Sequence, residues 1–572
     1  MRRIIIAALF TFAAAAAGAQ TLTEALSYSE NNYVGTARSM ALGNAMTALG
    51  GDLGSIGINP AGSAVAGYSQ FTISPGVTLM SNNAGYSTRF DEDYANFSPT
   101  NKNRFAMPNA GFSLKLDTYR TSGLKNCTVA VLANTTNQYL NHFFGNGING
   151  STSLLGSFGV GASPYSPSQL LDFNNFYDTN IPWNYLMAYQ SGMISEAYDE
   201  FGNPMVDAQG HNTYLGTTEA MYKLEDGGYD IRTAGALDQT SNVESIGSKT
   251  DLLINLGLNF NDNLYLGFNI GMPLISYRYN ESFRETAVDP SLFEVEYQDG
   301  AIANFSHATY EYSQSSDISG AYAKIGVIWL PFNGLRLGAA VQTPTAFTIE
   351  DHWYVSGNTA FTHSAYNTSV TSPDNSYSYS LTTPWRFNVG AALTLGSLGL
   401  LSADFETIDY SSMRFSTVDG NRNYFSVEND INYYFSGRQY EGRFGAEFKL
   451  CPEFSVRAGY SFKTSGEYCA IDKNGDRYTS GAYLAYYDDF ESGRNWFESK
   501  VADEALLNTF SAGVGYSSNG SFFADAAVSC TKYPVKYFSP YSDYITGGDT
   551  YLPEVANTRT LANVVLTLGW RF

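Results

Sequence analysis

The chain has 572 residues with 32 basic and 54 acidic side chains, which gives a net charge of -22. Binding to nucleic-acid phosphates needs clustered Lys and Arg, so this balance argues against a nucleic-acid partner. Hydrophobic residues make up only 44% of the chain, yet 15% of the residues are aromatic. This mixture is typical of a membrane β-barrel, whose outward face alone is apolar and whose aromatic residues gather at the two membrane interfaces.

Residues 1–19 have the three parts of a secretory signal peptide. Arg2-Arg3 precedes an apolar run over residues 4–17, and Ala17-Gly18-Ala19 supplies small residues for cleavage after Ala19. The apolar run has 14 residues, fewer than the roughly 18 to 20 that a membrane-spanning helix needs. No other segment is long and apolar enough to span, so a membrane location would require a barrel.

Residues 20–67 are predicted to be an N-terminal extension and a hatch, and within them residues 35–64 are small, apolar and glycine-rich, which predicts a compact plug rather than a strand. A short helical turn is expected to begin at Thr23. Over residues 37–49 the apolar side chains recur at three- and four-residue steps, the period of an amphipathic helix that Gly50-Gly51 should end. Asn59-Pro60-Ala61-Gly62 then predicts a reversal, because proline keeps the residue before it out of the helical region and glycine permits a sharp turn.

From Tyr68 onward the hydrophobic period changes to two, which predicts strands with one apolar and one polar face. The clearest pair covers residues 442–462, where two alternating runs are joined by Cys451-Pro452-Glu453 as in a hairpin. Further hairpins are predicted at 252–278, 321–348, 385–409 and 508–532. Soluble sandwiches also alternate, but the signal peptide, about 14 to 16 strand candidates and an alternating final segment that ends in Phe572 favour an outer-membrane barrel.

The order of a glycine-rich helix, an acidic turn and Ser-Ile-x-x-Asn-Pro-Ala-Gly over residues 55–62 resembles the N-terminal hatch of the FadL family. These are outer-membrane barrels that take up long-chain fatty acids and other hydrophobic compounds. Residues 320–351, 381–414 and 442–462 look like the strand blocks of that family.

The resemblance implies an all-β fold, a transmembrane antiparallel β-barrel of about 14 strands over residues 68–572, with a small helical hatch in its lumen. Asn59, Pro60, Ala61 and Gly62 would form the centre of the hatch. It also implies a monomer in contact with outer-membrane lipids and with the barrel-assembly machinery, which reads a terminal Phe.

The stretch from 139 to 248 lacks steady alternation and is predicted to be a long external loop after the third strand. The third strand is expected over Cys127 to Gln138, and the polar run at 134–137 could kink it as in FadL-like barrels, or could be an ordinary strand end. The resemblance suggests that apolar side chains of the loop and of the N-terminal segment bind ligand. These candidates are Leu22, Leu26, Phe143, Phe144, Phe158, Trp183, Leu186 and Met187.

The sequence contains no recognisable catalytic or metal-binding motif. Its five histidines lack the spacing of a metal site, and neither a Gly-x-Ser-x-Gly elbow nor a phosphate-binding loop occurs. We therefore expect no enzyme activity, no cofactor and no metal. Cys451 and Cys469 could pair in an oxidising compartment.

Two functions remain open at this point. The resemblance favours passive uptake of a hydrophobic molecule, by loop capture, hatch movement and release through the barrel wall. The alternative is a barrel of the same fold that serves as a docking platform for exported proteins or lipoproteins. Fatty acids, aromatic hydrocarbons and haem would all suit an aromatic lumen.

Overall fold

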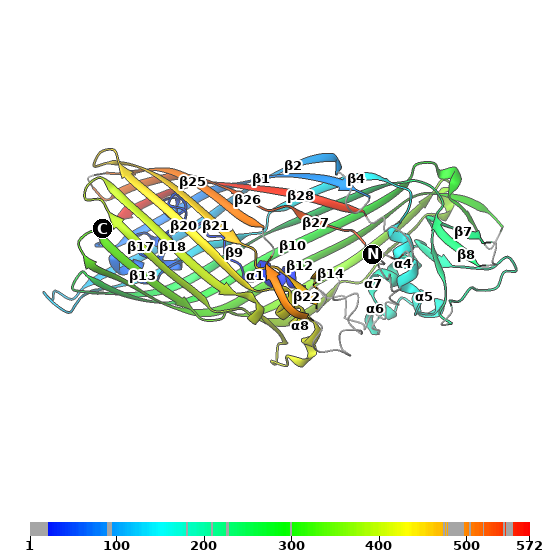
Figure 1. Ribbon diagram of the computed structural model, residues 1–572, viewed down its shortest axis with the longest axis horizontal. Helices are drawn as coiled ribbons and strands as arrows, with labels where there is room; N and C mark the ends of the chain where they lie inside the picture. Colours follow the sequence, from blue (N-terminus) through cyan, green and yellow to red (C-terminus); the bar gives the residue numbers. More distant parts are fainter. Residues whose placement is uncertain are drawn as a thin grey trace.

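A closed sheet of 14 antiparallel strands forms the body of the protein in the computed structural model (Figure 1), which confirms the predicted fold class. The structure describes residues 21–572 except 89–93, 179–180, 208–209, 225–227, 298–299, 473–474, 476, 479–496, 503–504, 519, 542–543 and 545–552. The proposed signal peptide therefore lies outside the described residues. The sheet closes where the first strand pairs with the last, with Phe71 opposite Trp570.

The wall strands are β1 (Gln70–Ser87), β2 (Ala95–Asp117), β3 (Leu124–Gln138), β9 (Leu237–Phe260), β10 (Leu264–Ala287), β12 (Ile302–Phe332), β13 (Leu335–Gln342), β17 (Arg386–Thr394), β18 (Gly399–Asp409), β20 (Arg438–Lys449), β21 (Phe454–Thr464), β25 (Leu506–Ser517), β26 (Phe522–Lys532) and β28 (Glu554–Arg571). Above β3, β13 and β17 the wall continues in β4 (Asn141–Asn149), β14 (Ala346–Phe361) and β16 (Asn375–Thr382). All these pairings are antiparallel.

Short turns close the end of the barrel at which the C-terminus lies (Figure 1). The turn between β9 and β10 is one example, in which Asn261 and Asp262 both have positive φ, at 55° and 57°. Two consecutive left-handed residues match the right-handed twist of a hairpin, and Asn and Asp tolerate that conformation best after glycine. The predicted hairpin at 252–278 is therefore present, with its turn at Asn261 and Asp262.

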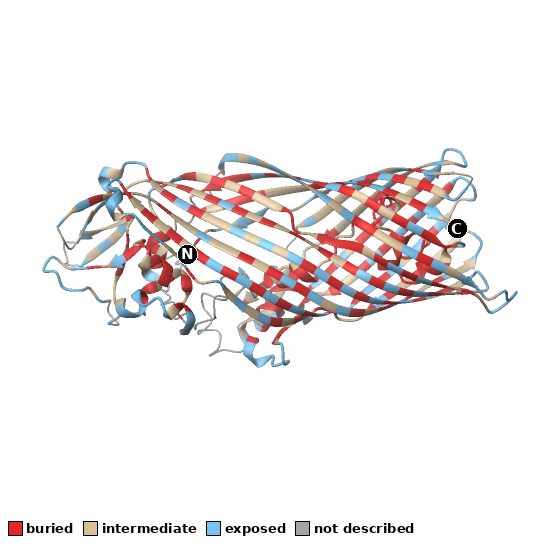
Figure 2. Cartoon of the chain, turned by 180° about the vertical axis from the view of Figure 1, so that it is seen from behind, coloured by how far each residue is buried: buried red, intermediate tan, exposed pale blue. Residues whose placement is uncertain are grey.

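The outer face of the barrel carries an apolar belt near the end with the short turns. On β10 the exposed residues Leu266 to Leu274 alternate with buried ones, and from Ser276 the outward positions become polar, with Arg278 and Asn280 next (Figure 2). This apolar run extends for about 27 Å along the strand, which is roughly 20 Å of height at the 35–45° tilt of membrane-barrel strands, somewhat less than their usual band of roughly 25 Å. Among the described residues no helix is long and apolar enough to cross a membrane.

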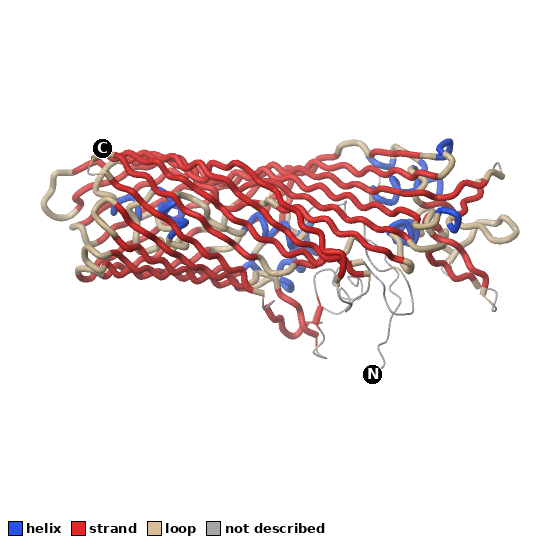
Figure 3. Tube along the Cα trace, turned by 90° about the horizontal axis from the view of Figure 1, so that it is seen from above, coloured by secondary structure: helices blue, strands red, loops and turns tan. Residues whose placement is uncertain are grey.

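The N-terminal segment lies inside the barrel, where Figure 3 shows its helices surrounded by strands. It contains α1 (Leu22–Ser29), α2 (Ala37–Ala41), η1 (Leu53–Gly57) and α3 (Gly62–Val65). The prediction of one helix over residues 37–49 is wrong, because α2 stops after five residues. Gly43 and Asn44 adopt left-handed φ values of 62° and 60°, and a Cβ at Gly43 would lie 2.9 Å from the Phe444 carbonyl oxygen, so contact with the wall overrides the helical period.

A helical lobe lies at the end opposite the C-terminus (Figure 1). It contains α4 (Leu154–Ala162), α5 (Pro167–Leu171), α6 (Asn175–Asp178), α7 (Trp183–Gln190), β5 (Ile194–Glu196), β6 (Tyr214–Gly216), β7 (Glu219–Lys223) and β8 (Tyr229–Thr233). The predicted loop limits of 139 and 248 are too wide, since β4 and β9 pair over Asn141–Asn149 and Leu237–Ser245. Strand alternation was hidden there because inward residues such as Ser241 are polar too.

The remaining described elements are η2 (Pro290–Leu292), β11 (Glu294–Glu296), η3 (Ser364–Tyr366), β15 (Thr368–Thr371), η4 (Tyr410–Ser412), β19 (Arg414–Thr417), η5 (Asn423–Phe425), α8 (Ser426–Phe435), β22 (Tyr468–Asp472), β23 (Arg477–Tyr478), β24 (Phe497–Ala502) and β27 (Lys536–Phe538). No disulfide joins Cys451 and Cys469. Cys451 precedes β21 and Cys469 follows it, so the length of this strand separates the two residues, far beyond the reach of a disulfide.

Candidate functional site: the hatch, the lumen and the wall

A collar of glycines in the wall makes room for the hatch, which we define as residues 21–67. A Cβ at Gly326 of β12 would overlap the side chain of Asn59, and one at Gly267 of β10 would overlap Pro60. Several other strands meet the hatch backbone in the same way, through Gly257, Gly338, Gly445 and Gly459, and Gly513 meets the Cβ of Ala41. The hatch therefore packs directly against wall backbone, which leaves no room for side chains between them.

Asn59 joins the hatch to itself and to the wall. Its Nδ2 donates to the carbonyl of Thr47 at 2.6 Å and to that of Val327, on β12, at 3.1 Å. Its Oδ1 accepts a hydrogen bond from the amide of Ala61 at 3.0 Å. Asn59 is fully buried, as are Pro60, Ala61 and Gly62, so the four residues singled out in the sequence lie together at the contact between hatch and wall.

α1 lies above the rest of the hatch in an apolar part of the lumen. Thr21 caps the helix and Glu24 completes a capping box. Leu22 and Leu26, both predicted to bind ligand, are buried in a cluster with inward-facing wall residues and with α8. The wall and α8 contribute Ile275, Ile318, Phe347, Ile349, Tyr379, Leu381, Ile431 and Phe435.

Basic side chains of the wall hold the chain that follows α1. Lys249 Nζ donates to the carbonyl of Tyr28 at 2.9 Å, Arg386 donates to the carbonyl of Ser29, and Lys463 Nζ donates to that of Asn31 at 2.6 Å. Tyr28 and Ser29 lie in the last turn of α1 and Asn31 follows it; backbone carbonyls at the C-terminal end of a helix lack partners in the helix itself. No local sequence pattern indicated these contacts, apart from the isolated basic residues in apolar strands.

The same chain segment is hydrogen-bonded to β3. The amide of Asn32 donates to the carbonyl of Thr136 at 2.6 Å, and the amide of Val34 donates to that of Thr135 at 3.1 Å. A register shift against β9 falls between Thr135 and Asn137. The wall strand is therefore displaced at this point and pairs with the hatch.

β3 parts from β2 in the same polar run, where the sequence suggested a kink. The two strands pair only as far as Asn109 opposite Asn134. Above this level β2 pairs with β1, while β4 pairs with β9, and within the described part of the chain no backbone ladder joins β2 to β4. Side chains bridge β2 and β4 instead: Thr100 donates to the carbonyl of His142, and Asn96 Nδ2 donates to that of Asn146 at 3.3 Å. Lys102 of β2 also forms an ion pair with Glu244 on β9.

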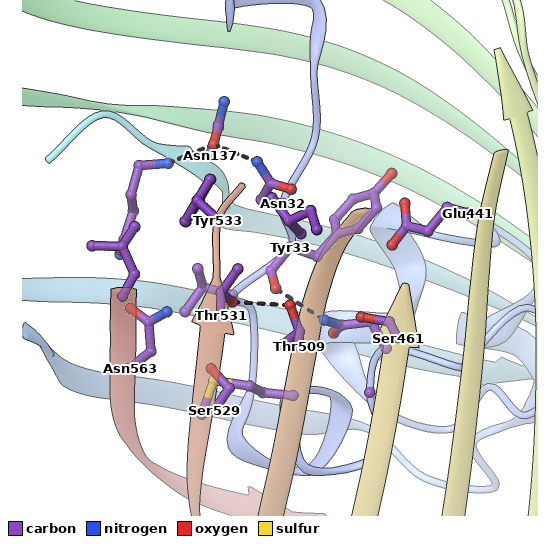
Figure 4. Close-up of a pocket in the computed structure, with 17 residues that line it drawn as sticks. Asn32, Tyr33, Asn137, Glu441, Ser461, Thr509, Ser529, Thr531, Tyr533 and Asn563 are labelled. Atoms are coloured by element: carbon purple, nitrogen blue, oxygen red, sulfur yellow. Dashed lines mark hydrogen bonds between the residues drawn. The ribbon is translucent and has the colours of Figure 1, made fainter. Parts of the chain in front are cut away.

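A cavity of about 610 Å³, open solvent included, lies between the hatch and strands β21, β25, β26 and β28 (Figure 4). Its lining is mostly polar. Asn32 donates to Asn137 Oδ1 at 3.0 Å, and the hydroxyls of Thr509 and Thr531 lie 2.9 Å apart. Amides and hydroxyls favour water over hydrocarbon, so this cavity suits water or a polar group.

The other predicted ligand residues fall in different places. Phe158, Trp183, Leu186 and Met187 are buried together in the lobe, where Trp183 lies 6.1 Å from Trp353 of β14 between ring centroids. Phe143 packs against Phe538 and Val555 in a separate cluster. Phe144, its neighbour on β4, is only half-buried. The predicted ligand residues thus lie in three separate places, namely the lobe, the lumen around α1 and a contact within the wall, and do not form one pocket.

Carboxyl groups gather in the lumen beside α1, above the level of the outer belt. Glu24 Oε1 accepts a hydrogen bond from Gln314 at 3.1 Å, and Asp351 Oδ2 accepts one from Tyr379 at 2.9 Å. Burial, and secondarily the nearby Asp351, raises the pKa of Glu24 from 4.5 to about 8. In the described part of the chain no group of three or more His, Cys, Asp or Glu is arranged to hold a metal ion.

These features define a closed barrel of the membrane type with an N-terminal plug. No family model and no curated protein sequence matches the chain. Matching solved structures include a Pseudomonas aeruginosa FadL homologue, with a TM-score of 0.46 and 10% identity over 95% of this chain and 100% of that one. The family of this homologue is the one that the hatch sequence resembles.

Two toluene transporters are also among the matches. TbuX of Ralstonia pickettii has a TM-score of 0.42 and 13% identity over 95% of this chain and 99% of its own. TodX of Pseudomonas putida has a TM-score of 0.43 and 10% identity over 95% and 100%. At these identities the likeness concerns the fold.

Proposed function

We propose that this protein is a FadL-like outer-membrane channel through which hydrophobic small molecules enter passively. The observation that carries the proposal is the apolar inner wall around α1, where Ile275, Ile318 and Ile349 face the lumen. A water-filled barrel has a polar interior at such positions. We call this apolar inner wall around α1 the seat of α1. When α1 withdraws from the seat, an apolar cargo could take the place of its apolar side.

The route that we propose begins at the lobe. Phe158, Trp183, Leu186 and Met187 capture the cargo, which then moves to the seat of α1 beside Leu22 and Leu26. The exit is the part of the wall where β2 and β3 are not paired, because backbone hydrogen bonds need not be broken there. The polar cavity of Figure 4 offers hydrocarbon no comparable path.

The proposal extends to the surroundings of the channel. The outer belt contacts outer-membrane lipids, the final strand is read by the barrel-assembly machinery, and the protein works as a monomer. Long-chain fatty acids and aromatic hydrocarbons both fit an apolar seat with aromatic walls.

Binding of a neutral apolar fluorophore, N-phenyl-1-naphthylamine, to the purified barrel in nanodiscs tests the proposal. Ile349→Asn places a polar group in the seat and should weaken binding at least tenfold. Thr348→Asn, on the outer face of the same strand, should leave it unchanged. Equal binding by wild type and Ile349→Asn would overturn the proposal.

A docking platform is the second candidate, because the lobe exposes apolar side chains. Phe201 is 81% exposed and Leu171 67%. Such a barrel should hold no apolar molecule in an organic extract, and should bring down a defined exported protein that is lost when both residues are replaced by Ser.

A further inference from the structure

Three carboxyl groups surround Gln314 on the inner face of β12. Glu24 receives a hydrogen bond from the amide of Gln314 at 3.1 Å. Glu281 of β10 lies directly opposite Tyr312 in the ladder, and the hydroxyl of Tyr312 donates to Gln314 Oε1 at 2.9 Å. Asp351 of β14 lies opposite Ser316, to which Gln314 also donates, at 3.2 Å. The helix and three wall strands thus bring these groups to one place.

One of these carboxylates lacks part of its hydrogen bonding. Asp351 is completely buried, and its Oδ2 accepts a hydrogen bond from the hydroxyl of Tyr379 at 2.9 Å. Ser316 and Gln314 also lie near this carboxyl, but among the described residues no donor has hydrogen-bond geometry to its Oδ1. A buried carboxylate oxygen without a donor is costly, so this atom marks a place where a positively charged or donor group is missing.

The basic side chains described below bind other groups and do not neutralise these carboxyl groups. Among the described residues none forms an ion pair with Glu24, Glu281 or Asp351. Lys249, which lies beside the end of α1, is held by the carbonyls of Tyr28 and Glu30 at 2.9 and 3.3 Å. Arg559 stacks 3.6 Å from the ring centroid of Tyr533.

Tyrosine rings complete the surroundings. Tyr279 and Tyr312 lie 6.2 Å apart between centroids, and neither ring is completely buried. Tyr279 donates to Glu281 at 2.9 Å, and Tyr28 donates to Ser316 at 3.4 Å. Aromatic ring faces and carboxylates together form the kind of site that binds ammonium groups.

We propose that this part of the lumen binds the ammonium group of an amphipathic organic cation, whose apolar part takes the seat of α1. The inference rests on the proposed uptake function and names its substrate class. A fatty-acid carboxylate would face three acidic side chains here, whereas an ammonium group would supply their missing counter-charge and a cation–π contact with Tyr279 or Tyr312.

Competition against N-phenyl-1-naphthylamine with three ligands of one shape tests the inference. These are 3-phenylpropylammonium, 3-phenylpropanol and 4-phenylbutyrate, measured with the full-length barrel in nanodiscs at pH 8.5. The ammonium compound should bind at least tenfold more tightly than the alcohol, and the carboxylate more weakly than both. Asp351→Asn and Glu281→Gln should each lower the preference for the cation about fivefold or more and leave alcohol binding unchanged.

The control is Glu350→Gln, which removes an exposed carboxylate on the outer face of the same strand as Asp351. It should keep the full preference. Equal binding of the cation and the alcohol, or tighter binding of the carboxylate, would overturn the inference and leave the uptake function standing. If none of the three ligands displaces the fluorophore, both the inference and the proposed uptake function are wrong. If Asp351→Asn does not fold, Glu281→Gln still tests the inference.

Discussion

The amide nitrogen of Asn32 lies 2.6 Å from the carbonyl oxygen of Thr136. This bond joins the segment after α1 to β3 at the level where β3 has left β2. Withdrawal of α1 from its seat therefore pulls on a chain that is hydrogen-bonded to the unpaired part of the wall. Ligand binding in the seat and opening of the wall are expected to be coupled through this contact.

A tether between this segment and β3 tests the coupling. The side-chain amides of Asn32 and Asn137 are in contact at 3.0 Å, which leaves their Cβ atoms too far apart for a direct disulfide. Asn32→Cys with Asn137→Cys, in a chain whose four native cysteines are replaced by Ser, should instead be joined by a bismethanethiosulfonate cross-linker. Cross-linking should lower uptake of the apolar fluorophore at least tenfold, and a reductant, which breaks the two bonds of the linker to the protein, should restore it. The same cross-link between Lys125→Cys and Asp262→Cys, at the end with the short turns, is the control. Full uptake by the cross-linked Asn32–Asn137 variant would refute the coupling.

The glycine collar predicts that one side chain in the wall loosens the hatch. Gly326→Leu would occupy the space of Asn59, and overpacking of this kind typically costs about 1–3 kcal/mol. We expect higher ion conductance in planar bilayers. Ala323→Leu, on the outer face of β12, should conduct like wild type. If Gly326→Leu stays as closed as wild type, the hatch does not fill the lumen as described.

Docking of α1 should weaken as pH rises. Glu24 has a pKa of about 8 in the lumen, because of burial and the nearby Asp351, against 4.5 ordinarily. The docked state therefore holds its proton over a range in which released α1 loses it, so docking is strongest below pH 4.5 and declines up to about pH 8.

A spin label at the exposed Thr23 measures this dependence. Its mobile fraction should grow between pH 5 and 8, and Glu24→Gln should flatten the curve. A mobile fraction in wild type that stays constant over this range would contradict the prediction.

Removal of an aromatic side chain from the lobe should reduce cargo capture while the lobe is still folded. Trp183 packs on Trp353 and edge-on against Phe176, and truncation of such a side chain costs about 3–5 kcal/mol. Trp183→Ala should lower uptake several-fold at limiting fluorophore concentration and lower the temperature at which the lobe unfolds. Tyr177→Ala, at a position that is 66% exposed, is the matched control. Unchanged uptake by Trp183→Ala would remove the lobe from the route.

Local patterns predicted the wall well. The period of two along β9 and β10, with Asn261 and Asp262 between them, fixes a hairpin without help from the rest of the chain. Asn59-Pro60-Ala61-Gly62 was likewise singled out from the sequence, and these residues lie at the contact between hatch and wall; their role as the centre of the hatch stays a prediction.

Contacts between residues far apart in the chain could not be predicted from local sequence patterns. The break at Gly43 depends on the Phe444 carbonyl, and the hydrogen bonds of Lys249 and Arg386 depend on carbonyls more than 200 residues away. Glycines at inward positions of neighbouring strands were visible in the sequence and could have indicated the collar. Phe143 and Phe144 were grouped by composition, although neighbours on a strand face opposite sides.

The polar outer face above Leu274 determines where cargo is met. From Ser276 to Ala287 β10 continues for roughly 35 Å along its length, beyond the apolar belt. The mouth and its lobe therefore stand clear of the lipid headgroups. The rate of uptake would then depend on the concentration of cargo dissolved in the medium rather than on its partitioning into the outer leaflet. Cells with a thicker layer of surface polysaccharide should therefore retain uptake.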